Sequence, residues 1–469
     1  MPSANPPKKA ETLDRFWESL LHEPLHDKKE LDAFYCQEVN AVRGEDRLPD
    51  LKQKLYRAHG GRHFRAFLAG HSGCGKSTEL ARFSLAVADR FRVIRFSAKD
   101  ELHPSSAKPF DVLILMMIRM TEEIRKLQSG GLKWEPPNDL LQKTLDWFAG
   151  ETVKKTETNE VKGSAEASAG ISGDSLWSKL LGLSAKLKGE IKYSSERKKE
   201  VIDYRVARLS ELSDLVNQFL DACNEQLRGL EGQREWLFLG EDFEKFLDSE
   251  IPRTFFVREA ALFKTLRTHL IFTIPVDLAW HAQGTSLPFP VFPIYDIPVY
   301  TKNNEPHKEG RAALRELLGK RINLNLFEAP HQLDRLIVAS GGHLRDLLDL
   351  VNDATDRVLI ETPPGAKIGK RHCTKAITKK QQEVLLRLGE SPYETGIEWK
   401  DRAACLVAIY KHDSDHEVAN KVTHSLLRSR AVQHFNGEGR FAVAPMVVSI
   451  LMRQGEIKPA DSPGGLLPE

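Results

Sequence analysis

The sequence predicts an α/β fold in which a parallel sheet carries helices on both faces. The first observation is a buried strand, residues 63–69, that leads through a glycine-rich turn into a helix, residues 78–86. The second is that this order repeats, because a second strand pattern, residues 91–97, precedes a helical pattern around residues 111–118. Strands that alternate with helices form parallel sheets, since each connection crosses back over one face.

Length and composition limit the classes of protein to which this chain can belong. The chain has 469 residues, enough for two or three domains, and its 68 Lys and Arg nearly balance 66 Asp and Glu. Overall charge therefore gives no argument for nucleic-acid binding. No uncharged apolar run reaches the roughly 18 residues of a spanning helix, and the N-terminus lacks the apolar core of a signal peptide. The five cysteines are scattered without a Cys-x-x-Cys pair. We expect a cytoplasmic protein without a cysteine zinc site.

The turn after the first strand fits the phosphate-binding pattern G-x-x-x-x-G-K-[ST] at every fixed position. Its residues are Gly70, His71, Ser72, Gly73, Cys74, Gly75, Lys76, Ser77 and Thr78. Glycine lets backbone N–H groups approach an oxyanion, and the N-terminus of the following helix favours negative charge. We predict that Lys76 reaches the β- and γ-phosphates of ATP, Ser77 binds Mg²⁺ and Thr78 approaches the α-phosphate. Cys74 is a small residue at a tight turn, and we expect it to react with alkylating agents.

A second apolar run, residues 236–240, ends in acidic residues. Acids at the carboxyl end of a buried parallel strand lie beside the phosphates, where one binds Mg²⁺ and another orients water. We assign Glu241 to the metal and Asp242 to water activation, with a shift of one position as an alternative. The simpler alternative is an acidic helix N-terminus that the helix dipole favours.

Residues 128–200 interrupt the alternation of strands and helices. The segment 151–173 has few residues able to build a core, and basic residues outnumber acidic ones over 176–199. A basic amphipathic stretch with one tryptophan is able to contact a membrane surface, nucleic acid or a partner protein. The alternative is a surface insertion whose leucines pack on the domain.

The last third is predicted to be mainly helical and to end in a hairpin around Asn436-Gly437. Helices followed by a hairpin have the order of a winged helix-turn-helix, with Arg428 and Arg440 available for DNA. Such a domain binds DNA or protein, and the sequence does not distinguish the two. The predicted segments are helices at 309–321 and 331–339, a basic linker at 367–380, and helices at 379–388, 399–412 and 419–429.

Together these segments resemble the AAA+ and STAND group of P-loop ATPases, with an initiator-like plan. The resemblance covers about residues 40–455 apart from the insertion, and the phosphate loop also looks like that of uncharacterised bacterial ATPases, some thought to act in antiphage defence. The resemblance implies an N-terminal helical segment (1–40), a P-loop ATPase core (41–300), a helical lid (301–366), a winged-helix domain (376–455) and a disordered tail (456–469).

The resemblance also implies roles for two more residues. The acidic strand resembles a Walker B motif, although Glu241-Asp242 replaces the usual Asp-Asp or Asp-Glu. Thr273 fits the sensor 1 position, or is simply a β-branched strand residue. Arg345 fits sensor 2 and would reach the γ-phosphate, or else is an exposed arginine paired with a neighbouring aspartate. The segment 275–301 contains neither Lys nor Arg, which puts the arginine finger of ring-forming relatives in doubt.

The leading hypothesis is an ATP-binding, Mg²⁺-dependent ATPase that acts as a switch. Nucleotide would close the lid on the core, and the change would pass to a partner protein or to DNA. The resemblance implies a homo-oligomer in some nucleotide state. One alternative is a DNA-binding initiator or transposition-type ATPase, and another is a nucleotide-binding scaffold without turnover. No base-specific motif separates ATP from GTP.

Overall fold

A computed structural model gives the arrangement of the chain. It describes residues 8–44, 46–58, 61–131, 133–156, 175–193, 205–231, 234–246, 248–280, 287–389, 394, 396–412, 420–435 and 441–458. The predicted hairpin turn at Asn436-Gly437, Arg440, most of the polar segment 151–173 and the end of the predicted tail lie outside these residues.

A parallel sheet forms the centre of the molecule and confirms the predicted α/β fold. Its strand order is β2-β3-β4-β1-β5, and neighbouring strands run parallel. Because the strands are parallel, their carboxyl ends share one edge, where the phosphate loop follows β1 and the acidic residues end β3. The strands are β1 (Arg65–Ala69), β2 (Phe91–Ser97), β3 (Glu235–Glu241), β4 (His269–Ile274) and β5 (Val291–Pro293).

Alternate residues of the strands build two separate cores. Phe67, Phe238 and Phe272 face one side and pack with the helix α7 (Pro109–Ser129). Leu68 and Leu237 face the other side, in the cluster that includes α4 (Arg47–Arg57) and α5 (Lys76–Ala86). The period of two along each strand therefore explains why both faces are covered by helices.

The closing strand is shorter than predicted. The sequence predicts strand over residues 292–300, but β5 ends at Pro293. Proline has no N–H group to donate to a sheet. Beyond it the N–H of Asp296 donates to the carbonyl of His434, 2.9 Å away, so the chain leaves the sheet for the C-terminal region.

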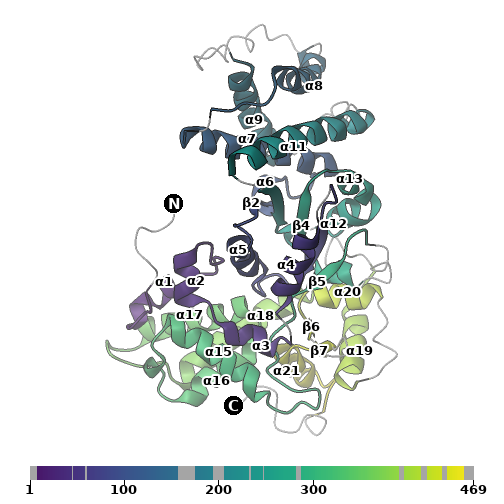
Figure 1. Ribbon diagram of the computed structural model, residues 1–469. Helices are drawn as coiled ribbons and strands as arrows, with labels where there is room; N and C mark the ends of the chain where they lie inside the picture. The colour runs from purple at the N-terminus through teal and green to yellow at the C-terminus, as the bar shows by residue number, and fades with distance from the viewer. Residues whose placement is uncertain are drawn as a thin grey trace.

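The insertion folds into a helical lobe on one side of the sheet (Figure 1). In the helix formed by the basic amphipathic stretch, Trp177, Leu180, Leu187 and Ile191 are buried, and the Trp177 indole donates to Gln128 at 3.0 Å. The apolar face of this helix packs within the lobe, as the simpler alternative expected. With α7, the lobe comprises α8 (Asn138–Thr156), α9 (Leu176–Tyr193) and α11 (Leu209–Glu231).

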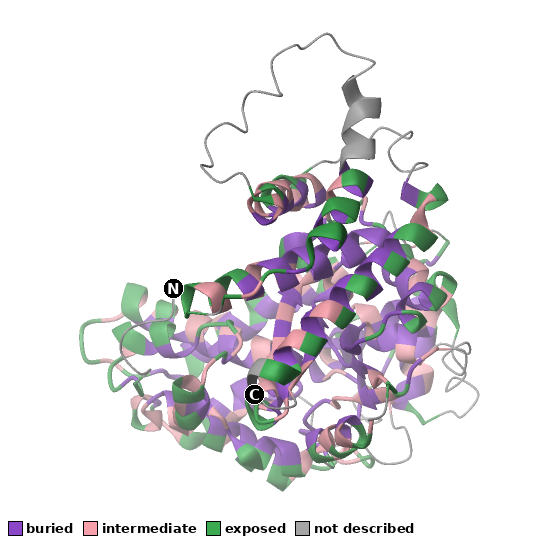
Figure 2. Cartoon of the chain, turned by 45° about the horizontal axis from the view of Figure 1, so that its top comes forward, coloured by how far each residue is buried: buried purple, intermediate pink, exposed green. Residues whose placement is uncertain are grey.

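The remaining helices surround the sheet and form the body on its other side (Figure 1). Figure 2 shows buried residues on their inward faces and exposed residues on the outer faces. Along the described chain, no helix combines the length and apolar character needed to cross a bilayer. These elements are α1 (Phe16–Ser19), α2 (Lys28–Phe34), α3 (Gln37–Val42), α6 (Ala98–Glu101), α12 (Glu250–Arg253), α13 (Ala260–Lys264), α14 (Val276–Ala279), α15 (Lys308–Arg321), α16 (Pro330–Ser340), α17 (Leu344–Glu361), α18 (Lys370–Arg387), α19 (Trp399–Tyr410), α20 (Lys421–Arg428), α21 (Pro445–Arg453), and short helical turns at 13–15, 243–245, 254–258 and 324–326.

The predicted basic linker at 367–380 is wrong. Most of it belongs to α18, which packs against α16 and α17. Cys373 and Ala376 on its inner face are buried, and Lys380 is buried in ion pairs with Asp346 and Asp349. The basic residues of this segment therefore form the exposed face of a helix, apart from Lys380, which is buried and paired with acids.

Helices α19 and α20 precede two antiparallel strands, β6 (Val432–His434) and β7 (Phe441–Val443). Helix α20 packs against α14 of the sheet region. At the other end of the chain, Phe16 and Leu20 share a core with Leu314 and Leu347 of the helices after the sheet. The first described helices and the C-terminal elements thus both pack on parts of the chain far from them in sequence.

Substitution of Gly240 with alanine tests the packing around β3. A Cβ at Gly240 would lie 2.5 Å from a ring carbon of Phe272 and 2.8 Å from one of Phe96. Both rings must shift, and overpacking of this kind costs about 1–3 kcal/mol. We expect Gly240→Ala to lower the urea midpoint followed by circular dichroism.

The matched control is Gly189→Ala in α9, where a Cβ meets nothing within 4 Å. Alanine is the better helix former, so this variant should be as stable as the wild type or slightly more so. A Gly240→Ala midpoint equal to that of Gly189→Ala would contradict the packing described for β3.

Candidate nucleotide-binding site

The glycine-rich loop adopts a backbone that requires glycine. Gly73 and Gly75 have φ of 88° and 105°, in the left-handed region, and Gly75 caps the N-terminus of α5. A Cβ on Gly73 would lie 2.8 Å from His343 and 3.0 Å from Arg345. The glycine therefore also lets the start of α17 approach the loop.

Lys76 is buried in the loop and is fully paired. Its Nζ donates to the carbonyl oxygens of Gly70 and His71 at 2.8 and 2.9 Å and lies 2.8 Å from Oε1 of Glu244. Burial alone would lower the pKa of Lys76, but the nearby negative charge of Glu244 outweighs it, so the pKa lies above its usual value. The site thus holds a charged ammonium in a position where a phosphate would compete with Glu244.

The two acids predicted from the sequence have other partners. Glu241 accepts a hydrogen bond from Nε of Arg95 at 2.6 Å. Asp242, in a left-handed conformation with φ 66°, accepts one from the Ser97 hydroxyl at 2.8 Å and pairs with Lys245 at 2.6 Å. Although burial opposes its ionisation, Lys245 lowers the pKa of Asp242 below its usual value.

Glu244 is the acid that joins the loop to β4. Besides its ion pair with Lys76, its Oε2 accepts a hydrogen bond from the Thr273 hydroxyl at 2.8 Å. Glu244 was not predicted from the sequence. The signal available in the sequence is the run Glu241-Asp242-Phe243-Glu244. Phe243 is fully buried, and the acid after it returns to the edge of the sheet.

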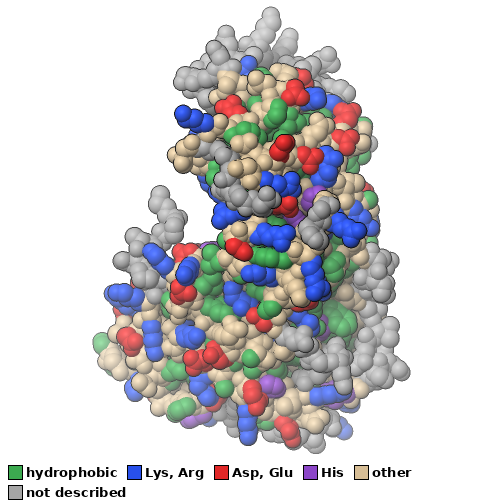
Figure 3. All heavy atoms as spheres, in the orientation of Figure 1, with side chains coloured by type: hydrophobic (Ala, Val, Ile, Leu, Met, Phe, Trp, Pro, Cys, Tyr) green, Lys and Arg blue, Asp and Glu red, His purple; other side chains and the backbone are tan. Residues whose placement is uncertain are grey.

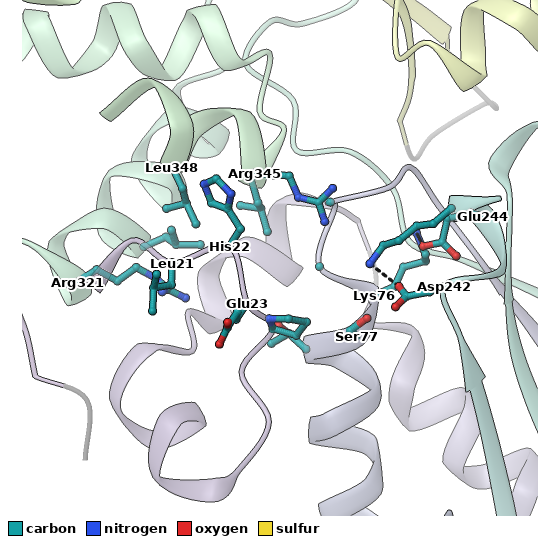
Figure 4. A pocket seen from close by; sticks show the side chains of 17 residues that line it. Leu21, His22, Glu23, Lys76, Ser77, Asp242, Glu244, Arg321, Arg345 and Leu348 are labelled. Atoms are coloured by element: carbon teal, nitrogen blue, oxygen red, sulfur yellow. Dashed lines mark ion pairs between the residues drawn. The ribbon is translucent and has the colours of Figure 1, made fainter. Parts of the chain in front are cut away.

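A pocket of about 750 Å³, including its open mouth, extends from the loop toward the N-terminal segment, α15 and α17. Figure 4 shows Lys76, Ser77, Asp242 and Glu244 at one side and Leu21, Arg321 and Leu348 at the other. Thr78 also lines the pocket, and its hydroxyl accepts a hydrogen bond from the Leu25 N–H at 3.2 Å. The pocket therefore has a polar end and a more apolar end.

The apolar end was not predicted from the sequence. Leu21 precedes the phosphate loop by about fifty residues, whereas Leu317 and Leu348 follow it by more than two hundred. Only the packing of the N-terminal segment on α15 and α17 brings them together, and no local pattern carries that information.

The start of α17 contacts the loop directly. The His343 ring donates from Nε2 to the Ser72 carbonyl at 2.7 Å, and Arg345 donates to the Ser72 hydroxyl at 3.4 Å. Arg430, which precedes β6, lies 2.9 Å from the His343 ring and 3.2 Å from Asp346. The structure thus places Arg345 at the phosphate loop, while Asp346 pairs with Arg430 and Lys380.

A second buried contact lies behind the loop. Asp296 is 2.7 Å from Nδ1 of His71 and also accepts the N–H of His434 at 2.9 Å. Burial would raise the pKa of Asp296, but His71 and the hydrogen bonds lower it to about 2. Asp296 is the single acid of an apolar run, 291–300, a signal the sequence analysis did not use.

Cys74 is 2% exposed, and burial raises the pKa of its thiol. Because thiolate is the nucleophile, the structure disfavours the expected reaction of Cys74 with alkylating agents. Its role is to fill the turn.

The oxygen donors at this edge suit a hard cation. The Ser77 hydroxyl and the carboxylates of Glu241 and Asp242 border the same cleft. In the described part of the chain, no three His, Cys, Asp or Glu side chains form a ready metal cage. Mg²⁺ commonly takes one or two protein ligands together with phosphate oxygens and water, so the residues present fit it.

Comparisons with known proteins give weak likenesses. No protein-family model and no curated protein matches the chain. Among solved structures, it is similar to a Walker-type ATPase of Pyrococcus abyssi (11% identity, TM-score 0.42, covering 93% of this chain and 99% of that one). It is also similar to the Orc1 protein of Aeropyrum pernix in complex with DNA (13%, 0.36, 94% and 96%) and to Cdc6p of Pyrobaculum aerophilum (11%, 0.35, 88% and 94%). These values are too low to assign an activity to this chain.

The region behind the loop makes stability depend on pH. Burial lowers the pKa of His434 to about 3. Asp296 opposes this shift, and His71 adds a smaller contribution to it. The unfolded chain binds a proton at this imidazole below about pH 6.5, whereas the folded chain does not. The free energy of unfolding therefore falls as the pH drops from about 6.5 toward 3, by about 2 kcal/mol for this group at pH 5.

We expect His434→Gln to lose less thermal stability than the wild type between pH 7 and pH 5. His63, whose pKa burial lowers to about 4, contributes equally to both proteins and cancels. Equal losses in the two proteins, measured by differential scanning fluorimetry at both pH values, would mean that His434 is solvated.

Proposed function

We propose that this chain binds a nucleoside triphosphate with Mg²⁺ beside residues 70–78 and hydrolyses it. The observation that carries the proposal is the buried Lys76 ammonium in a loop whose glycines expose the N-terminus of α5. Such a loop binds phosphate through backbone N–H groups, the lysine and the helix dipole. At the pocket's other end Leu21, Leu317 and Leu348 lie with Arg321, so aliphatic side chains there offer a surface for the base.

Hydrolysis requires positive charge beside the phosphate oxygens and an oriented water molecule. In our assignment Ser77 and Glu241 hold Mg²⁺, which neutralises charge on the phosphate oxygens. Lys76 leaves Glu244 for the phosphates, and Thr273 keeps Glu244 in place as acceptor for the attacking water. Water attacks the terminal phosphorus, the bond to the bridging oxygen breaks, and the diphosphate leaves with the electron pair. We favour Glu244 over Asp242 for the water because the phosphates would draw Lys76 away from Glu244, whereas Lys245 and Ser97 would still hold Asp242.

The contacts of the loop support a switch function. Arg345 and His343 bind Ser72, and Arg430 binds His343, so a phosphate that recruits Arg345 would also alter the contact of the C-terminal elements. We propose that residues 301–366 act as a lid and residues 376–455 as a winged-helix domain that reports nucleotide state to a partner protein or DNA. In the present arrangement α20 packs on α14, which favours a protein partner over duplex reading by this helix.

Replacement of Lys76 with alanine should abolish the stabilisation by Mg·ATP. For ligand at 100 times its Kd, the wild type gains about 2.7 kcal/mol. The variant leaves Glu244 buried without its ammonium, so the ligand-induced shift in melting temperature is compared rather than the absolute value. Lys54→Ala, which removes a surface pair with Asp50 and a contact with the Phe292 ring, both made by a residue that does not line the pocket, is the control and should keep the shift. An unchanged shift in Lys76→Ala would remove the loop from the proposal.

Glu244→Gln and Asp242→Asn separate the two candidate acids. Glu244→Gln keeps an oxygen for Thr273 but weakens the ion pair with Lys76, so ATP should bind more tightly while turnover falls at least about 100-fold. Asp242→Asn should reduce turnover less. Phosphate release and ATP titration measure both quantities, and the opposite ranking would return the water-orienting role to Asp242.

A further inference from the structure

Arg95 lies beside the candidate site and has no role in the assignment above. It stands on β2, the edge strand, opposite Leu239 of β3. Its Nε donates to Oε1 of Glu241 at 2.6 Å, and its Nη2 donates to the Ser77 carbonyl at 3.1 Å. One guanidinium therefore joins the acid at the end of β3 to the first turn of α5.

Arg95 faces a broad cleft that adjoins the pocket. The cleft is open to solvent and shares Ser77, Asp242, Lys245 and Arg345 with the pocket. Figure 3 shows Lys and Arg side chains gathered at the level where the lobe meets the body. The side chain of Arg95 is 23% exposed, so it has room to change rotamer without unpacking the core.

Two of the neighbouring cations are held by other acids, and Arg345 donates to the Ser72 hydroxyl. Lys245 pairs with Asp242, and Arg119 pairs with Glu101. Arg95 differs because its partner, Glu241, is the residue assigned to the metal. A divalent cation at Glu241 would compete with the guanidinium for the same carboxylate, since two cations repel at short range.

A released Arg95 would stay in the cleft that it shares with Ser77, Asp242 and Lys245. A guanidinium presents donors that match phosphate oxygens, so a change of rotamer toward the adjoining pocket would bring it to a terminal phosphate bound there. The segment 275–301 supplies no Lys or Arg. The charge that develops in phosphoryl transfer can therefore be met by cations already at this edge, Lys76 and Arg345, and Arg95 would add a third.

We propose that Arg95 is an arginine supplied in cis. It holds Glu241 when the site lacks metal, and it exchanges Glu241 for the terminal phosphate when Mg·ATP binds. When water attacks the terminal phosphorus and the bond to the bridging oxygen breaks, Arg95 binds the phosphate oxygens and stabilises their added charge. This inference rests on the proposed ATPase function and adds a catalytic residue to it.

The test uses the full chain and three variants. Arg95→Ala removes the guanidinium, and Arg95→Lys keeps a charge beside Glu241 without the forked donor geometry. Arg92→Ala is the matched control, because Arg92 lies on the same strand but pairs with Glu123 of α7. Two quantities are measured: the rate of phosphate release with Mg·ATP, and the affinity of the nucleotide-free protein for Mn²⁺ alone, by electron paramagnetic resonance.

Arg95→Ala should lower turnover at least about 1,000-fold, in the range of other arginines that act on phosphoryl transfer. It should also bind Mn²⁺ several-fold more tightly than the wild type, because Glu241 no longer has a competing cation. Arg95→Lys should lower turnover at least about 10-fold and leave Mn²⁺ affinity near that of the wild type. If Arg95→Ala does not fold, the turnover of Arg95→Lys is used to decide the test.

Turnover of both Arg95 variants equal to that of Arg92→Ala would overturn the inference while leaving the ATPase proposal intact. Unchanged Mn²⁺ affinity in folded Arg95→Ala would overturn the exchange at Glu241. A wild type that neither binds nor hydrolyses Mg·ATP would instead refute the proposed function itself.

Discussion

The buried ammonium of Lys76 is the constraint around which the site is built. A charge removed from water must be paired, and here two loop carbonyls and Glu244 supply the partners. The same Glu244 is held by Thr273, so the first, third and fourth strands in chain order meet at one cation. Because the partners are a carboxylate and backbone oxygens, an incoming phosphate can replace Glu244 without leaving the ammonium unpaired.

The phosphate loop is also the point where the later parts of the chain converge. His343 and Arg345 reach Ser72 from α17, and Asp296 joins His71 to the backbone of His434. A change at the loop therefore acts on two contacts of the C-terminal elements at once. These direct contacts couple the loop to the C-terminal elements, so the proposed switch needs few intermediate residues.

The sequence predicted the elements whose signals are local. The loop, the strands β1 to β3 and the helix α5 arise from glycine spacing and from runs of strand length, and the structure has them close to the predicted bounds. The helix predicted around residues 111–118 is present but longer, as α7. The pairing of side chains was not accessible in this way. Arg95 and Glu241 are 146 residues apart in the chain, and His71 and Asp296 are 225 apart. Glu244 was overlooked because its place depends on Phe243 turning into the core. Only the second half of α18 was predicted as helix, because basic residues in its first half look like those of a linker.

Hydrogen–deuterium exchange with and without Mg·ATP tests the central claim most directly. The account predicts slower exchange in peptides that cover residues 70–78 and, in the same sample, in peptides that cover residues 341–346, because the ligand would engage the loop and α17 together. Protection of the loop alone would contradict the coupling, and protection of neither would contradict nucleotide binding at Lys76.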